Sequence, residues 1–293
     1  WSTVIPFIAR ASDQFYRVEF SDGSMLSATA NHEFSVSTPT NKPNFKKLRA
    51  DQLKVGMYLP KFDLPVPDTG LETTLAYTLG AFTGDGYIDA GYPFICSVED
   101  RANKLYGNCE IQSSGLVWKA PGSTNKTMLR ARVDWQPHRA QFPLELWASL
   151  RDKEAGLPEQ VMSFGKSSIL QFIAGWIDTD GSVRNKSLDN QSFIICGTAR
   201  QKLLDAQLLL RRAGINHTTV RRTAQKGQVT NYGSRNYGNY DLWVLQIPTF
   251  ECSEIPTILK QITSTGDRYR PNSAPNPAHV TSAPIDTAHA QRI

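Results

Sequence analysis

Two stretches of the sequence each join a run of small and apolar residues to a terminal Asp-Gly, and this repeated pattern constrains the fold most. They are Leu-Gly-Ala-Phe-Thr-Gly-Asp-Gly at 79–86 and Ile-Ala-Gly-Trp-Ile-Asp-Thr-Asp-Gly at 173–181. If each is a helix, its small residues would let the two backbones pack closely side by side. Asp85 and Asp180 would then lie at the same end of the pair. The small residues are Gly80, Ala81, Gly84, Ala174 and Gly175.

Two carboxylates held close together repel each other unless cations neutralise them. Hard divalent ions with oxygen ligands meet that need, and such ions can activate water and stabilise a leaving oxygen in phosphodiester hydrolysis. The alternative is a pair of capped helices whose Asp residues only serve turns. One motif would leave that alternative open, whereas two motifs in matching halves of one chain favour a divalent-metal site.

Periodicity around the two motifs predicts an α+β fold with an internal duplication. Leu75, Leu79 and Phe82 recur at helical spacing in a segment that starts at Leu71 and that Gly84 and Gly86 would end. Further helices are expected at 167–181 and 199–214, and strands at 129–135, 191–196, 217–222 and 240–247.

The N-terminal region has a different pattern. Residues 15–36 alternate apolar and polar residues around Ser-Asp-Gly-Ser, which predicts a β-hairpin. Residues 44–62 indicate a short helical turn, a Gly-led turn and a strand, and Pro-Val-Pro-Asp-Thr-Gly at 65–70 marks a boundary. The Pro- and Ala-rich residues 271–293 are typical of an extended linker.

Composition excludes several classes of protein. The four cysteines form no Cys-x-x-Cys pair, so a zinc site or disulfide scaffold is not expected, and the thiols should be reduced and mostly buried. No apolar run approaches the ~20 residues of a membrane span, and the first residues do not resemble a signal peptide. The net charge of +5 is compatible with a polyanionic partner, and the expected location is intracellular, in the cytoplasm, nucleoid or nucleus.

Both Asp-Gly segments resemble the LAGLIDADG motif of homing endonucleases. The resemblance implies two pseudo-symmetric αββαββ halves, at about 71–157 and 158–270, within a domain at 67–270 that presents a saddle-like sheet to DNA. It implies that Asp85 and Asp180 bind the metal, Mg²⁺ or Mn²⁺, with Gly84 and Thr179 beside them. Asp178 is not at the family's metal position, and we expect it to be a solvated or helix-end acid.

The family also places a basic residue near each metal site. Lys153 stands two residues before the position at which many members have Lys, and Arg268 replaces the Lys of a Lys-Phe-Arg-Pro segment. Arg holds its charge and could stabilise phosphate, but it would hardly act as a base. Lys153 and Arg268 are therefore candidate catalytic helpers or ordinary surface charges.

A second resemblance lies in the N-terminal region. Ser21-Asp22-Gly23 followed by Ala-Thr-Ala-Asn-His at 28–32 resembles a block of intein and hedgehog-type (Hint) self-splicing domains, in which a Thr and a His polarise the splice-junction peptide bond. Thr29 and His32 match those positions. The resemblance implies a partial all-β Hint domain at 1–66, to which the linker at 271–293 returns. Because the chain lacks both splice-junction ends, splicing by this chain alone is not expected.

A double motif predicts a monomer whose unequal halves suit an asymmetric double-stranded DNA target. Each half would offer a twisted sheet to the major groove, where Arg reads guanine or grips phosphate and Tyr packs on sugars. Solvated hairpin faces are the alternative for any single residue. The candidates are Lys119, Lys126, Arg130, Arg132, Arg221, Arg222, Lys226, Tyr232, Arg235 and Tyr237, in hairpins that include His217 and Tyr240.

The sequence therefore predicts an intein-borne, metal-dependent endodeoxyribonuclease that cuts both strands of a long site. Two alternatives remain open: a non-cleaving nucleic-acid binder or RNA maturase on the same scaffold, and a protein-splicing element with an inert insert. The altered basic helpers favour the binder slightly, whereas the two intact acids oppose it.

Overall fold

The computed structural model describes residues 15–37, 45–59, 69–119, 127–185, 191–226, 240–262 and 278–279. The chain divides into two compact units, Trp1–Phe62 with Ala274–Ile293, and Asp63–Ser273. Among the helices in these described ranges, none combines the length and apolarity that a membrane crossing requires.

The first unit begins with the expected hairpin. Strand β1 (Phe15–Glu19) pairs antiparallel with β2 (Met25–Thr29). In the turn between them Gly23 has a φ of 85°, which glycine adopts without steric cost. The Asp22 carboxylate accepts the Ser24 N–H at 3.0 Å and stabilises the turn. The hairpin predicted around Ser-Asp-Gly-Ser is confirmed.

A four-stranded sheet completes the first unit. Its strand order is β14-β5-β3-β4. The helical turn predicted within 44–62 is the 3₁₀ turn at Ala50–Gln52, and the Gly-led turn and a strand follow it as expected. The sequence does not predict β4, which precedes this turn and pairs along its whole length with β3. The strands are β3 (Glu33–Ser37), β4 (Phe45–Arg49), β5 (Tyr58–Leu59) and β14 (Ala278–His279), the last lying within the segment predicted as linker.

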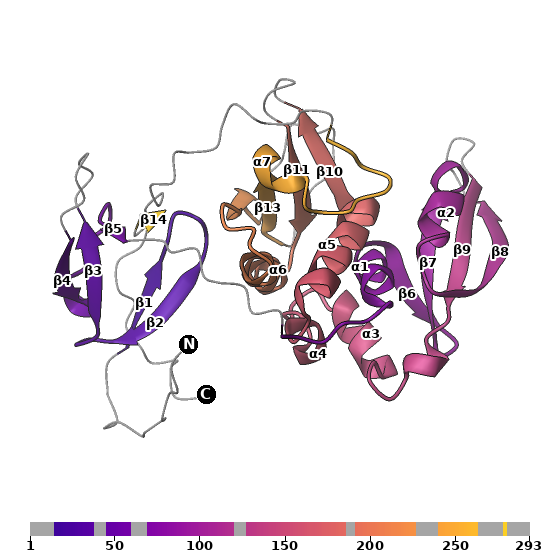
Figure 1. The fold of residues 1–293 in the computed structure, drawn as a ribbon, viewed down its shortest axis with the longest axis horizontal. Helices are drawn as coiled ribbons and strands as arrows, with labels where there is room; N and C mark the ends of the chain where they lie inside the picture. Colours follow the sequence, from indigo (N-terminus) through magenta and orange to yellow (C-terminus); the bar gives the residue numbers. More distant parts are fainter. Residues whose placement is uncertain are drawn as a thin grey trace. The chain divides into compact units, whose positions relative to one another are not determined.

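The centre of the second unit is a pair of helices, α1 (Ala76–Asp85) and α5 (Lys166–Asp180), which lie side by side between two sheets (Figure 1). A Cβ atom on Gly80 would lie 2.8 Å from the Phe172 carbonyl carbon, and one on Gly175 would lie 2.8 Å from the Ala81 nitrogen. Only glycine permits this approach, so the predicted close packing is confirmed. Helix α1 begins five residues later than expected and includes Gly84 in its last turn.

Each helix continues directly into a four-stranded antiparallel sheet. The strand orders, β6-β7-β9-β8 and β10-β11-β13-β12, are the same in the two sheets when counted from the strand after the helix. The strands are β6 (Gly86–Asp89), β7 (Tyr92–Val98), β8 (Ile111–Lys119), β9 (Thr127–Val133), β10 (Gly181–Asn185), β11 (Gln191–Gly197), β12 (Thr219–Ala224) and β13 (Leu242–Pro248).

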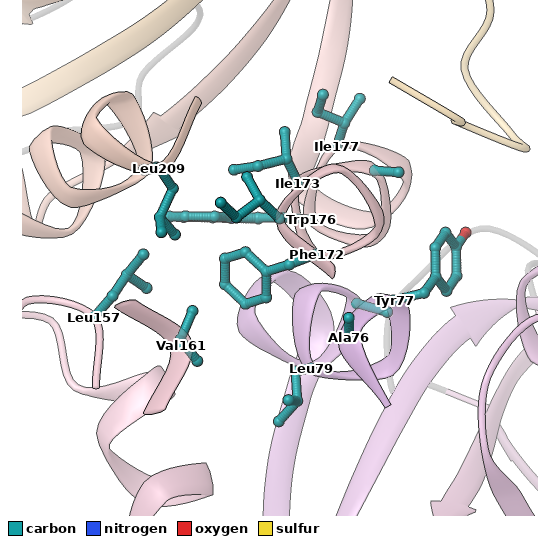
Figure 2. Packing of buried hydrophobic residues seen from close by; sticks show 14 of the residues in the cluster. Ala76, Tyr77, Leu79, Leu157, Val161, Phe172, Ile173, Trp176, Ile177 and Leu209 are labelled. Atoms are coloured by element: carbon teal, nitrogen blue, oxygen red, sulfur yellow. The ribbon is translucent and has the colours of Figure 1, made fainter. Parts of the chain in front are cut away.

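The other helices pack on the sheets and on the central pair. Trp176 extends from α5 toward Leu209 of α6, and Phe172 lies between α5 and α1 in the buried core (Figure 2). The expected helix at 199–214 is α6, and Gly214 follows its end with a φ of 95°. The helices are α2 (Glu99–Tyr106), α3 (Leu144–Arg151), α4 (Glu159–Met162), α6 (Arg200–Arg212) and α7 (Thr249–Cys252), besides a 3₁₀ turn at Gln136–His138.

Candidate active site

The two acids of the repeated motif meet at one end of the helix pair. Asp85 is the last residue of α1 and Asp180 is the last of α5. A Cβ atom on Gly84 would lie 2.9 Å from the Asp180 Cβ, so the two helix ends touch. Burial raises the pKa of both carboxyl groups, and the Asp85 charge raises that of Asp180 further. The two acids therefore form one electrostatic site, as the sequence predicted.

A guanidinium group occupies the end of α1. Arg151, the last residue of α3, donates from Nη1 to the Thr83 carbonyl at 2.6 Å and to the Gly84 carbonyl. A cation at the carboxyl end of a helix is stabilised by the unpaired carbonyls there. The Arg151 charge also lowers the pKa of Asp85 and Asp180, against the effect of burial.

An ammonium group occupies the end of α5 in the same way. Lys260 donates from Nζ to the Ile177 carbonyl at 2.7 Å, to the Thr179 carbonyl at 3.0 Å and to the Gly181 carbonyl. Its charge lowers the pKa of both Asp85 and Asp180. A basic side chain therefore bonds to the last carbonyls of each acidic helix.

These basic residues are not the two that the sequence suggested. Lys153 lies nearby, in the lining of a pocket that also contains Asp180, whereas Arg268 lies outside the described residues. The residues bonded to the helix ends are Arg151 and Lys260, which no local motif marks. Gly84 and Thr179, predicted beside the metal, do lie at the site, but their carbonyls accept bonds from these two cations.

A pocket of ≈ 250 Å³ opens beside Asp180, between the ends of α3 and α5 and the start of α6. Three basic side chains line it, those of Arg151, Lys153 and Lys202. Positive charge next to a carboxylate suits a phosphate group that arrives together with a cation.

Asp178, expected to be a solvated or helix-end acid, lies in the last turn of α5 but is buried and not solvated. Asp178 is only 1% exposed, and its carboxylate accepts four hydrogen bonds. The donors are the Tyr77 hydroxyl of α1 at 2.8 Å and three consecutive main-chain N–H groups at 258–260. Burial and the Asp178 charge together raise the pKa of Tyr77, which therefore stays a hydrogen-bond donor.

The half-buried thiols of Cys96 and Cys196 lie near the site. Burial raises the pKa of each, and so does the charge of Asp85 on Cys96 and of Asp180 on Cys196, so both remain protonated. The prediction of free cysteines is confirmed, but of the four only Cys252 is fully buried.

Two arginines predicted to contact DNA lie on one face of β9. Ala131 and Val133 of this strand are buried in the core, so Arg130 and Arg132, which alternate with them, face the opposite side. The Arg132 guanidinium lies 3.3 Å from the centre of the Tyr92 ring. That of Arg130 stacks on the Phe94 ring at 4.8 Å, so both are held in place before any ligand arrives.

Of the other predicted contact residues, some lie on the sheet that follows α5 and some lie outside the described residues. Arg221 is exposed, and Arg222 pairs with Asp241 at 3.4 Å. Lys226 is also exposed, and its main-chain N–H bonds to the same carboxylate. Lys119 ends β8, and Lys126, Tyr232, Arg235 and Tyr237 lie outside the described residues.

In the first unit, Thr29 ends β2 and donates from Oγ1 to the Asn31 side chain at 2.8 Å. His32 follows it, is exposed, and meets the Phe34 ring edge-on at 4.9 Å. The His32 N–H donates to the Thr29 carbonyl at 3.0 Å, so the two residues predicted for splicing chemistry lie close together.

Part of the second unit is similar to a known protein family. Residues 167–246 match the family model of a LAGLIDADG-like domain. This LAGLIDADG-like segment contains Asp180 and the sheet that follows it, except for the last two residues of β13. No curated protein matches the chain significantly.

Similar solved structures include I-DmoI in complex with DNA and Mn, at 16% identity and a TM-score of 0.38, covering 64% of this chain and 96% of that chain. They also include I-DmoI with DNA and Ca, at 15% identity and a TM-score of 0.37, covering 67% and 95%. A third is the homing endonuclease I-WcaI bound to its DNA recognition sequence, at 12% identity and a TM-score of 0.37, covering 64% and 80%.

Proposed function

We propose that this protein is a site-specific endodeoxyribonuclease that hydrolyses both strands of a long, asymmetric double-stranded DNA site. The observation that carries the proposal is the meeting of Asp85 and Asp180 at the joined ends of α1 and α5. The match of residues 167–246 to a LAGLIDADG-like domain supports it.

A divalent cation fits the donors of this site. Burial and mutual repulsion make two adjacent carboxylates costly unless a cation joins them, and burial raises the pKa of both. Among the described residues no group of three or more His, Cys, Asp or Glu side chains could hold a metal. This donor set suits Mg²⁺ or Mn²⁺, because Mg²⁺ commonly uses one or two carboxylates and completes its shell with water and substrate phosphates.

In this proposal Asp85 and Asp180 hold the ion, which neutralises phosphate charge and favours attack by water. Arg151 and Lys260 fix the ends of the two helices and add positive charge where the phosphate arrives. Lys153 and Arg268 remain proposed helpers, the first because it lines the pocket beside Asp180.

The two sheets are proposed to be the DNA-binding faces of pseudo-symmetric halves, which together form a saddle on a monomer. Their equal strand order and their direct continuation from the acidic helices support this. Arg130 and Arg132, stacked on aromatic rings of one face, would contact DNA there. The further contacts proposed are Lys119, Lys126, Arg221, Arg222, Lys226, Tyr232, Arg235 and Tyr237.

We further propose that the nuclease at 67–270 interrupts a Hint domain formed by 1–66 and 271–293, within an intein that resides with DNA inside the cell. The support is the sequence around Thr29 and His32 and the pairing of β14 with β5, which joins a segment before 67–270 and a segment after it in one sheet. If the endonuclease insert is inert, the alternative function of the whole element is protein splicing.

A second candidate is a non-cleaving DNA binder or RNA maturase. It is favoured by the Gly84 and Thr179 carbonyls, which already accept bonds from Arg151 and Lys260 instead of being free for a metal. The two candidates make the same prediction for binding and differ for cleavage.

The deciding experiment uses a plasmid that carries the host-gene sequences on both sides of the insertion joined together. With Mg²⁺ or Mn²⁺ we expect the wild-type protein to linearise it. Asp180→Asn should lower the cleavage rate by at least about 10³-fold, because a bound ion contributes several kcal/mol to the barrier, and should leave binding largely intact.

The matched control is Asp100→Asn, an exposed acid in the first turn of α2, which makes the same change in charge. Cleavage by Asp180→Asn at a near wild-type rate would contradict the role of that carboxylate. Tight binding without cleavage by the wild-type protein would favour the second candidate.

A further inference from the structure

The buried carboxylate of Asp178 is bonded to the main chain beside Lys260. The Ile258 N–H donates to Oδ2 at 2.7 Å, and the Leu259 and Lys260 N–H groups donate to Oδ1 at 2.9 and 3.0 Å. The Tyr77 hydroxyl completes the set. Four donors satisfy an ionised carboxylate that water hardly reaches, so this bonding fixes the path of the chain at 258–260.

The fixed segment determines where the Lys260 side chain begins. From there its ammonium group turns back to the carbonyls that end α5, those of Ile177, Thr179 and Gly181. Asp178 itself is two residues before Asp180 on the same helix. One helix thus anchors a distant segment through a carboxylate and receives the basic side chain of that segment at its own end.

Arg151 is held by the opposite arrangement. The buried ammonium group of Lys202, from α6, donates to the carbonyls of Leu150 at 2.8 Å, Asp152 at 2.5 Å and Ser149 at 3.3 Å. These carbonyls belong to residues on both sides of Arg151 in the sequence, and the Arg151 guanidinium bonds to the end of α1.

From these contacts we infer that Asp178 and Lys202 are positioning residues of the acidic site, the first acting through Lys260 and the second through Arg151. The Asp178 carboxylate accepts bonds from main-chain N–H groups, and the Lys202 ammonium group donates to main-chain carbonyls. In each case the bonded main-chain segment carries one of the two basic residues at the helix ends. This inference rests on the proposed function only for its effect on cleavage, since the positioning itself exists without metal or DNA.

Cleavage kinetics can separate positioning from a general loss of structure. We expect Asp178→Asn to lower the single-turnover rate on the joined-flank plasmid about 10- to 100-fold, as is typical when a supporting hydrogen bond behind a metal site is removed. In a Lys260→Ala background the same substitution should have almost no further effect, because the two residues act in series. Lys202→Met should behave in the same way with Arg151→Ala.

The chain offers a matched control for each variant. Glu251 is a buried carboxylate that accepts the Asn216 and His217 N–H groups, and Arg212 donates to the Met162 and Phe164 carbonyls. Neither set of hydrogen bonds positions Arg151 or Lys260, so the Glu251→Gln and Arg212→Met variants should cleave at the wild-type rate. Rate losses of Asp178→Asn and Lys260→Ala that multiply in the double variant would overturn the inference.

A second measurement needs neither metal nor DNA. In protein labelled with ¹⁵N-lysine, an ammonium group held by three carbonyls exchanges slowly with water, and Lys260→Arg identifies its signal. We expect Asp178→Asn to abolish this signal and Glu251→Gln to keep it. If Asp178→Asn does not fold, Tyr77→Phe, which removes one of the four donors, should weaken the signal.

The two proposals can fail separately. An unchanged Lys260 signal in Asp178→Asn, or in Tyr77→Phe where the first variant does not fold, overturns the positioning role whether or not the protein cuts DNA. A wild-type protein that does not cut while the signal responds as expected overturns the proposed function alone.

Discussion

Lys202 of α6 is only 5% exposed, yet its ammonium group donates hydrogen bonds to three carbonyl oxygens. Burial, helped by the Arg151 charge and opposed by Asp152 and Asp205, lowers its pKa to about 8. The group is therefore protonated at neutral pH, at a cost in desolvation that the native state bears and the unfolded chain does not.

The pH dependence of stability tests this shift. Between about pH 8 and the ordinary Lys pKa of 10.5 the unfolded chain binds a proton that the native state lacks. Stability contributed by this site should therefore rise with pH across that window, by at most about 1.4 kcal/mol per pH unit. Urea unfolding of wild type and Lys202→Met from pH 7 to 10, without metal, measures the difference. Equal slopes for the two proteins would contradict the lowered pKa.

At the scale of elements, the contact between α1 and α5 decides where the acids meet. Gly80 and Gly175 allow main chain to lie against main chain, and Gly84 lies against the Thr179 and Asp180 side chains, with no space for a Cβ atom at any of the three. Since Asp85 and Asp180 each end their helix, any separation of the helices also separates the acids. Stability and the geometry of the site therefore depend on the same glycines.

Gly175→Ala should destabilise the protein by about 1–3 kcal/mol, the usual cost of overpacking, because the new methyl group would overlap the Tyr77 carbonyl. Gly197→Ala is the control, since its nearest neighbour would be a Leu203 methyl at 3.9 Å. Denaturant unfolding of both variants makes the comparison. Near-equal midpoints would mean that the helices can move apart without cost.

At the scale of the whole molecule, the chain has a net charge of +5, and the second unit presents arginines on the open face of a sheet. Arg130 also bonds to Tyr87 and Asp89, so its charge is partly compensated, whereas Arg132 rests on Tyr92. Arg132 should therefore contribute more than Arg130 to attraction of the phosphate backbone.

DNA binding should depend steeply on salt. If about 6–10 phosphates are contacted, raising the salt from 50 to 200 mM weakens binding by about 10³–10⁵-fold. Arg132→Gln should reduce the slope of log affinity against log salt by about one if it holds one phosphate. Fluorescence anisotropy with the joined-flank duplex measures both slopes, and a flat response of the wild-type protein would contradict binding through the sheets.

The residues that the sequence predicted well are those whose information is local. The spacing of apolar residues gives the helices at 167–181 and 199–214, and a Ser-Asp-Gly-Ser turn gives the first hairpin. Strand β4 was missed because pairing with β3, and not local propensity, makes it a strand.

What the sequence by itself determined is the pair of acidic helices, because small residues and Asp-Gly ends repeat at a spacing that specifies both the packing and the charge. Only the tertiary structure decided which basic residues bond to the ends of these helices. Arg151 and Lys260 lie 67 and 81 residues from the Gly84 and Thr179 carbonyls that they bond. Asp178 is likewise buried because Tyr77 and the segment at 258–260 bond to its carboxylate. The sequence next to Asp178 does not predict those partners.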